Sequence, residues 1–264
     1  MAARVVRISI APVKSLGLVH PDEVELGPGG VPGDRRFWLV DERGRLVNAK
    51  QVGSLLAVRP AWDERTGRLE LAFPDGRVVA GTVEPGEPVE VEMYGDPLPS
   101  RRVEGPWAAA LSELAGMPLS LLWSEQGAPD RTLRGGTVSL VSRGSLERLR
   151  EETGADGPVD GRRFRMLFEL DGVDPHAEDG WLGEDVQVGD AVVRVNGDVG
   201  RCAVTTRHPD TGLVTLDTLG ALARYRREGR TEPLPFGVYG SVLEPGRVRV
   251  GARVGVVDAP LHFR

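Results

Sequence analysis

The residue with the clearest chemical potential is Cys202, the only cysteine among 264 residues. It lies in the stretch 196–212, NGDVGRCAVTTRHPDTG, directly after Arg201, a cation that favours the thiolate form of a neighbouring cysteine. A thiolate binds soft metals such as molybdenum, copper or zinc, and it acts as a nucleophile when a base such as His208 lies within reach. No second ligand residue lies at the sequence spacing that is typical of zinc sites. A lone cysteine is most often a small buried apolar residue. On these residues alone, ligand, nucleophile and packing residue all stay open.

A second group consists of basic residues at strand ends and glycine-rich turns, where side chains and free amides converge on anions. Arg36 is the strongest candidate, because it directly precedes the apolar run FWLV. The alternative is a scatter of solvated surface charges. The group comprises Lys14 with Ser15, Arg35 with Arg36, Arg162, Arg163 and Arg165, and Arg201.

Composition argues against several other functions. A net charge of -6 is unfavourable for binding nucleic acid or an anionic membrane, and the five tryptophans are spread singly, which does not suit base stacking. One cysteine excludes an intramolecular disulfide and a four-thiolate iron–sulfur cluster. The glycine clusters match neither a P-loop nor a dinucleotide fingerprint, and the acidic segment 171–179 is typical of a solvated loop.

The sequence also predicts where the protein is found. No apolar run approaches the roughly 20 residues that cross a bilayer. The first residues, MAARVVRISIAPVKS, are too polar for a signal peptide. We therefore expect a cytoplasmic protein that does not associate with membranes.

The elements that must position these residues are mainly strands, since 35 glycines and 20 prolines interrupt the chain at short intervals. Alternating apolar residues and turn dipeptides predict strand after strand up to about residue 100. Helices are predicted over 106–114, after Ser142 as N-cap, and after Asp217 as N-cap with an end at Gly229. A polar loop over 126–136 is expected to influence access of substrate. The fold class is therefore α+β, predominantly β.

Five segments, in this order and spacing, resemble the MOSC-domain family over nearly the whole chain. They are similar to bacterial relatives of the mitochondrial amidoxime-reducing component and to the C-terminal domain of molybdenum cofactor sulfurases. The resemblance implies a MOSC N-terminal β-rich domain over 1–100, whose first strands are able to complete the barrel, and a β-barrel MOSC domain over 101–264. The segments are PVKSLG at 12–17, GDRRFWLVDERGRLVNAKQ at 33–51, FRMLFELDG at 164–172, GRCAVTTRHPDTG at 200–212 and FGVY at 236–239.

The resemblance further implies a molybdenum–molybdopterin cofactor, with Cys202 as the catalytic thiolate that ligates the metal. The cofactor carries a phosphate and a dithiolene, so cations and a soft thiolate suit it. Two positions depart from the family: Leu167 replaces an asparagine of the FRPN stretch, and Gly200 stands where mitochondrial relatives have serine. By position, the residues implied to hold the phosphate and pterin are Lys14, Ser15, Arg36, Ser142, Arg165 and Arg201.

The function that the resemblance implies is an oxidoreductase that reduces N-hydroxylated compounds, such as amidoximes, hydroxylamines or N-hydroxylated bases. With one cysteine and no further domain expected, a separate electron-donor protein of flavoprotein, iron–sulfur or cytochrome type is predicted. The expected substrate is a small N-oxygenated molecule, and no nucleic-acid polymer is expected to bind. The alternatives are a non-redox carrier of the cofactor or of sulfur, with a persulfide on Cys202, and a binding module whose thiol is structural.

Overall fold

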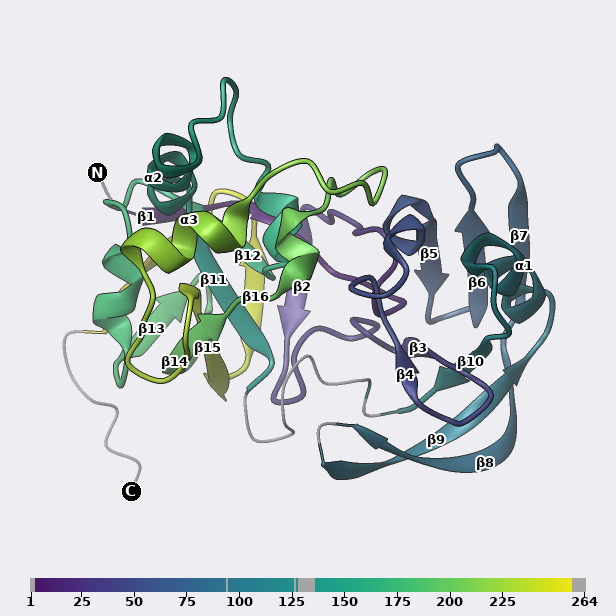
Figure 1. Cartoon of the computed structure of the whole chain (residues 1–264). Coiled ribbons are helices and arrows are strands. Elements are labelled where there is room, and N and C mark those ends of the chain that lie inside the picture. Colours follow the sequence, from purple (N-terminus) through teal and green to yellow (C-terminus); the bar gives the residue numbers. More distant parts are fainter. Residues whose placement is uncertain (1–2, 94, 126, 128–135, 258–264) are drawn as a thin grey trace.

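A computed structural model describes residues 3–93, 95–125, 127 and 136–257. Two halves lie side by side, a closed barrel and a second half of smaller sheets (Figure 1). Residues 126 and 128–135 of the expected polar loop lie outside the described residues. None of the helices in the described part is long and apolar enough to cross a membrane.

Seven strands form the closed barrel. Neighbours are antiparallel except β11 and β12, which are parallel and joined through helix α2 (Arg143–Thr153). Apolar side chains fill the interior, because alternate residues of each strand point inward. Around the barrel the order is β1 (Ala3–Ile8), β12 (Phe168–Asp171), β11 (Val138–Ser142), β15 (Pro235–Glu244), β14 (Ala191–Gly200), β13 (Asp185–Val188) and β17 (Arg253–Val256).

Two sheets and one helix make up the other half. Helix α1 (Trp107–Ala115) packs on them, and Trp107 is buried in their common core. The five-stranded sheet has the order β4 (Leu46–Val47), β3 (Phe37–Val40), β10 (Ser120–Trp123), β9 (Asp96–Glu104) and β8 (Glu84–Met93). The three-stranded sheet has the order β5 (Arg59–Asp63), β6 (Arg68–Ala72) and β7 (Val78–Thr82). The expected fold class, predominantly β with few helices, is confirmed.

The boundaries between the two halves differ from the expected domain boundary at residue 100. Strand β1 belongs to the barrel, and β2 (Glu23–Leu26) pairs with β16 (Gly246–Arg249). Residues 101–123, which we expected in the second domain, stay with the N-terminal half because Val103, Leu111 and Leu121 are buried in its core. The segment 11–18 also packs there, since Val13 and Leu16 are buried in the same core. We call residues 11–18 and 27–125 the N-terminal half and the rest of the described chain the barrel half.

The predicted helices are present. The αL residue Gly116 ends α1, and Ser142 caps α2 by accepting a hydrogen bond from the Ser145 backbone N–H. Asp217 caps α3 (Thr218–Tyr225), but this helix ends before the expected Gly229. The backbone leaves the helix at Arg226, whose guanidinium donates to the Pro235 carbonyl oxygen at 2.9 Å.

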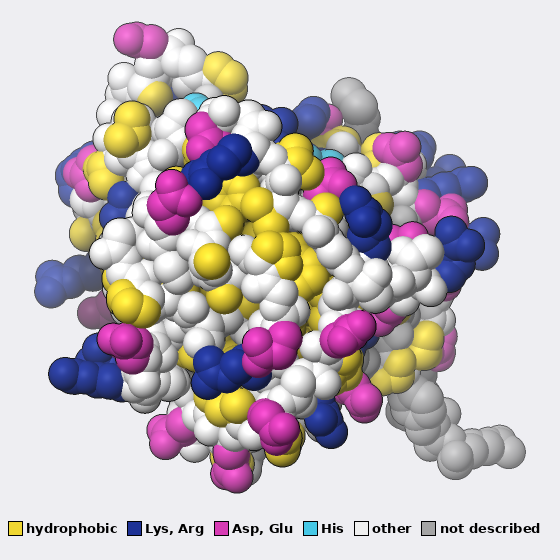
Figure 2. Space-filling view, turned by 90° about the vertical axis from the view of Figure 1, so that its right-hand side faces the viewer, with side chains coloured by type: hydrophobic (Ala, Val, Ile, Leu, Met, Phe, Trp, Pro, Cys, Tyr) yellow, Lys and Arg dark blue, Asp and Glu magenta, His cyan; other side chains and the backbone are white. Residues whose placement is uncertain are grey.

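The outer face of the N-terminal half carries interspersed basic and acidic side chains around a central group of apolar ones (Figure 2). Val78 on β7 is 58% exposed. No single sign of charge dominates this face, in contrast to the pocket described next.

Candidate functional site

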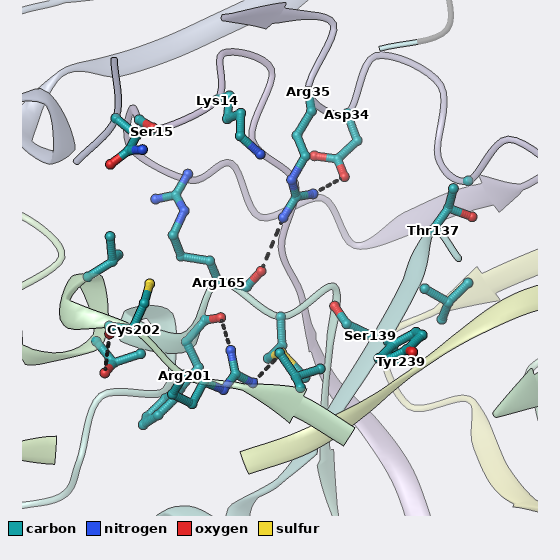
Figure 3. A pocket seen from close by; sticks show the side chains of 18 of the residues that line it. Lys14, Ser15, Asp34, Arg35, Thr137, Ser139, Arg165, Arg201, Cys202 and Tyr239 are labelled. Carbon is teal, nitrogen blue, oxygen red and sulfur yellow. Dashed lines mark hydrogen bonds and ion pairs between the residues drawn. The ribbon is translucent and has the colours of Figure 1, made fainter. Parts of the chain in front are cut away.

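A pocket of about 300 Å³ opens between the two halves. In Figure 3, Cys202, Ser15 and Arg165 lie toward one end, and Thr137, Ser139 and Tyr239 lie toward the other. Of the predicted site residues, the structure brings five together at this pocket: Lys14, Ser15, Arg165, Arg201 and Cys202.

The wall from the N-terminal half is built by two segments that run side by side. Lys14 donates its backbone N–H to the Phe37 carbonyl oxygen at 2.7 Å, and Arg35 donates its own to the Ala11 carbonyl oxygen at 2.7 Å. Pro12 supplies no donor, but its carbonyl oxygen accepts the Phe37 backbone N–H at 3.0 Å, so the pairing continues past the proline. This pairing brings Lys14 beside Arg35, although 20 residues separate them in sequence.

Three residues of the pocket hold a left-handed backbone conformation that non-glycine residues rarely adopt. The φ angles are 76° at Ser15, 50° at Arg35 and 55° at Arg165. Only two other described non-glycine residues have positive φ, His176 and Leu234. Such strain concentrates at functional sites because the surrounding contacts must hold it in place.

Arg35 connects the two halves across the pocket. Its guanidinium pairs with Asp34 and donates to the Arg165 carbonyl oxygen at 3.4 Å. Asp34 also accepts the Ala11 backbone N–H at 2.7 Å. The strained loop around residue 35 is therefore fixed both to the neighbouring segment and to the barrel half.

Cys202 lies where β14 leaves the barrel. The Arg201 backbone N–H donates to the Leu234 carbonyl oxygen at 3.2 Å, and Cys202 then caps the 3₁₀ turn η4 (Ala203–Thr206). Its carbonyl oxygen accepts from the backbone N–H and hydroxyl of Thr205, at 3.1 and 3.0 Å. The residue itself is exposed. The interpretation of Cys202 as a buried packing residue is therefore wrong.

Arg201, which we expected to favour the thiolate and to hold the cofactor, also makes several hydrogen bonds to the protein. Its guanidinium donates to the carbonyl oxygens of Phe236 and Phe164 and to the Met166 sulfur at 2.8 Å. It also lies over the Phe164 ring, 5.2 Å from the centroid. Arg201 therefore lines the pocket while tying the end of β14 to β15 and to the segment before β12.

The structure places Arg36 and Ser142 outside the residues that line the pocket. Arg36 follows the left-handed residue Arg35, and its guanidinium pairs with Glu64 and donates to the Ser124 carbonyl oxygen at 3.4 Å. Ser142 lies three residues beyond the pocket residue Ser139 on β11, about 10 Å along the strand. There its side chain is fully buried and caps α2.

Several residues that line the pocket were not predicted as site residues from the sequence. Lys50 belongs to the NAKQ segment that carried the family resemblance, and Tyr239 to the FGVY segment, so a signal was present for both. Ser139 had no such signal. Lys14 and Lys50 are the only lysines in the chain, and both line this pocket.

The charge of the pocket is strongly positive among the described residues that line it. A single carboxylate, Asp34, accompanies six cations, although the whole chain carries -6. Burial lowers the pKa of Arg163, which donates to the Thr206 carbonyl oxygen at 3.2 Å. The cations are Lys14, Arg35, Lys50, Arg163, Arg165 and Arg201. Such a cluster attracts an anionic ligand.

The candidate partners of the thiol are few. His208 does not line the pocket, and its Nδ1 accepts the backbone N–H of Asp210 at 3.2 Å. Among the described residues, no group of three or more His, Cys, Asp or Glu side chains is placed to hold a metal ion. A metal at Cys202 would therefore take most of its ligands from a non-protein group.

Comparison with known proteins gives two domain matches. Residues 2–110 match the MOSC N-terminal beta barrel domain, and residues 130–255 match the MOSC domain. A protein named molybdenum cofactor sulfurase from Anopheles gambiae is 28% identical over 269 residues, which cover 89% of this chain and 34% of that protein. The chain thus spans about a third of the length of that relative.

Two further likenesses cover most of both chains. Mitochondrial amidoxime-reducing component 1 from Xenopus laevis is 25% identical over 284 residues, 93% of this chain and 79% of that protein. The crystal structure of the YUAD protein from Bacillus subtilis aligns over 96% of this chain and 94% of that one, at 14% identity with a TM-score of 0.48.

Proposed function

Since this chain carries a MOSC N-terminal beta barrel domain followed by a MOSC domain, we propose that its pocket holds a molybdenum–molybdopterin cofactor and that it reduces N-hydroxylated compounds. The names of its relatives, molybdenum cofactor sulfurase and amidoxime-reducing component, support a role connected with this cofactor. Reduction of an N–OH group is the reaction that we assign within that role.

The observation that carries the proposal is the donor set of the pocket. One exposed thiol is accompanied by six cations, and the described residues contain no other cluster of metal ligands. A soft metal that brings its own dithiolene needs few ligands from the protein, and the phosphate of the cofactor needs cations. The residues present therefore fit this cofactor.

The side chains would divide the work by their chemistry. Cys202 would ligate the metal, while Lys14, Ser15 and Arg165 would bind the phosphate and the polar edge of the pterin. When bound, the cofactor supplies the two-electron chemistry that removes oxygen from nitrogen. Arg201 would fix the chain directly before Cys202 against β15 and against the segment before β12, through its bonds to Phe236 and Phe164.

The proposal includes a separate electron-donor protein, because one cysteine cannot supply the four thiolates of an iron–sulfur cluster. It also includes a small N-oxygenated substrate and a cytoplasmic location. The exposure of Cys202 supports direct access of a small molecule to the metal.

The first test is the molybdenum content of the protein purified from a molybdenum-replete host. We expect molybdenum and pterin fluorescence in the wild type, and a loss of metal of about tenfold or more in Cys202→Ser, because a hydroxyl is a poor ligand for a soft metal. Arg165→Gln should also lose cofactor, whereas its matched control Arg36→Gln, outside the pocket, should retain it.

The second measurement is reduction of benzamidoxime with an artificial electron donor. Turnover in the wild type that is lost in Cys202→Ser supports the reductase. Cofactor binding without turnover would instead favour a carrier of the cofactor or of sulfur. Wild-type protein that stays free of molybdenum and pterin after reconstitution would exclude both.

A further inference from the structure

The HPDTG segment of the sequence is not explained by the cofactor. We call residues 207–212 the 207–212 turn, and in Figure 1 it lies in the light-green loop that reaches toward the N-terminal half. The Gly212 backbone N–H donates to the His208 carbonyl oxygen at 2.8 Å, and the Arg207 guanidinium donates to the Gly212 carbonyl oxygen at 2.8 Å. The turn is therefore closed by its own backbone and by Arg207.

The turn also contacts the N-terminal half. The Arg207 guanidinium donates to the Lys50 carbonyl oxygen at 3.1 Å. Gly53 packs so closely against the turn that a Cβ on it would overlap Arg207 and the Gly212 carbonyl oxygen. Gly212 has a φ of 71° and faces the backbone of Gly53 in return. Two glycines thus allow the two backbones to approach.

Asp210 connects the 207–212 turn to the 3₁₀ turn η2 (Gly161–Phe164) and to β5. It accepts two hydrogen bonds from Arg162, at 2.9 and 2.7 Å, and lies 3.6 Å from the Arg59 guanidinium of β5. The hydrogen bonds from Arg162 lower the pKa of Asp210, so the carboxylate stays ionised. Arg162 lies in η2, and this 3₁₀ turn ends directly before the pocket residue Arg165.

We infer that Arg207 is a positioning residue that sets the separation between Cys202 and Lys50 on opposite walls of the pocket. It follows the thiol by five residues, and its guanidinium holds the carbonyl oxygen of Lys50 itself. The inference rests on the proposed function only in that the two walls would hold one cofactor. The separation itself is measurable without any cofactor.

The chain offers an unambiguous probe of this separation. Cys202 is the only thiol, and Lys14 and Lys50 are the only side-chain amines. Lys50 is exposed, whereas Lys14 is 6% exposed. A thiol-to-amine cross-linker therefore joins Cys202 chiefly to Lys50, and peptide mass spectrometry identifies the product.

The experiment compares cross-linkers of graded length on the full chain, in the wild type and in Arg207→Met, which keeps an aliphatic stem but loses the donors. We expect the yield with the shortest reactive linker to fall roughly fivefold or more, and the yield with a long linker to stay constant, because effective concentration falls steeply once a linker cannot span its sites. Arg207→Lys can reach one of the two carbonyl oxygens, so its yield with the shortest linker should lie between the yields of the wild type and Arg207→Met.

The matched control is Arg224→Met, since Arg224 donates to the Glu152 carbonyl oxygen at 2.9 Å but does not line the pocket. It should cross-link as the wild type does. A folded Arg207→Met with wild-type short-linker yield would overturn the inference, and if that variant does not fold, an Arg207→Lys variant with unchanged yield does the same. A protein that binds no molybdenum but shows the expected cross-linking would refute the proposed function alone.

Discussion

Single residues define this pocket through their backbones as much as through their side chains. Ser15, Arg35 and Arg165 each adopt a left-handed conformation that costs about 1–3 kcal/mol for a non-glycine residue. Contacts on both sides hold them, for example the bond from the Arg165 backbone N–H to the Arg162 carbonyl oxygen at 3.1 Å. The strain fixes the direction of two cations before any ligand binds, which reduces the ordering required on binding.

At position 200, neighbouring residues leave no room for a side chain, which explains the glycine there. A Cβ on Gly200 would lie 2.8 Å from a Glu232 carboxylate oxygen and 3.0 Å from the Pro233 carbonyl oxygen. The serine of mitochondrial relatives therefore does not fit here unless residues 232–233 move. Leu167, the second departure from the family, is buried in the barrel core and does not line the pocket.

We expect Gly200→Ser to lower the free energy of unfolding by about 1–3 kcal/mol, because the added atoms overlap backbone as well as a side chain. Urea denaturation measures this loss. The control Gly255→Ser lies on β17 with no atom within 4 Å of its Cβ position, and should change stability by less than about 0.5 kcal/mol. Equal stability of the two variants would contradict the close packing at Gly200.

At the scale of elements, the start of α2 accounts for the polar contacts of Ser142, which does not line the pocket. The Ser142 hydroxyl accepts the Ser145 backbone N–H at 3.0 Å, and its own backbone N–H donates to Glu178 at 3.1 Å. Glu178 also accepts the Ser145 hydroxyl at 2.7 Å. Burial raises the pKa of Glu178, and these hydrogen bonds partly oppose that rise. The polar groups around Ser142 are thus used to begin a helix.

We expect Ser142→Ala to cost about 1–2 kcal/mol of stability, the usual effect of losing an N-cap, and to leave molybdenum content per folded protein unchanged. Thermal unfolding and metal analysis of the same samples test both parts. Asp217→Ala is the matched control, because Asp217 caps α3 by accepting the Gly220 backbone N–H at 2.8 Å. A selective loss of metal in Ser142→Ala would restore Ser142 to the site.

At the scale of the whole molecule, the two halves share chain segments. Strand β1 closes the barrel although the residues that follow β2 build the other half (Figure 1). Gly53 and Gly212 then bring the halves into backbone contact at the pocket. Because neither half is complete without the chain that crosses to the other, we expect them to unfold together.

The variant Ile8→Ala tests this coupling. Ile8 is fully buried in the barrel, so truncation should cost about 2–5 kcal/mol. Four of the five tryptophans, at 38, 62, 107 and 123, lie in the N-terminal half, and their fluorescence should shift to lower urea together with the far-ultraviolet circular dichroism. A tryptophan transition at the wild-type midpoint would show independent halves. Val78→Ala, at an exposed position, is the control.

The sequence by itself determined the strands, the helix starts and the segments that supply the thiol and the cations. Local chemistry decides these features: proline and glycine interrupt ladders, Ser142 and Asp217 satisfy helix N–H groups, and one cysteine admits one thiolate. The segments around Lys14 and Cys202 were therefore recognisable before any fold was known.

Only the tertiary structure decided which neighbouring residue enters the pocket. Arg35 lines it and Arg36 does not, because the left-handed turn at Arg35 separates the two side chains. The first pairs with Asp34 at the pocket, and the second pairs with Glu64. The contacts of Arg207 with Lys50 and of Gly53 with Gly212 join residues more than 150 positions apart, and no local pattern encodes such pairs. These contacts form only where the two folded halves meet around a positively charged pocket.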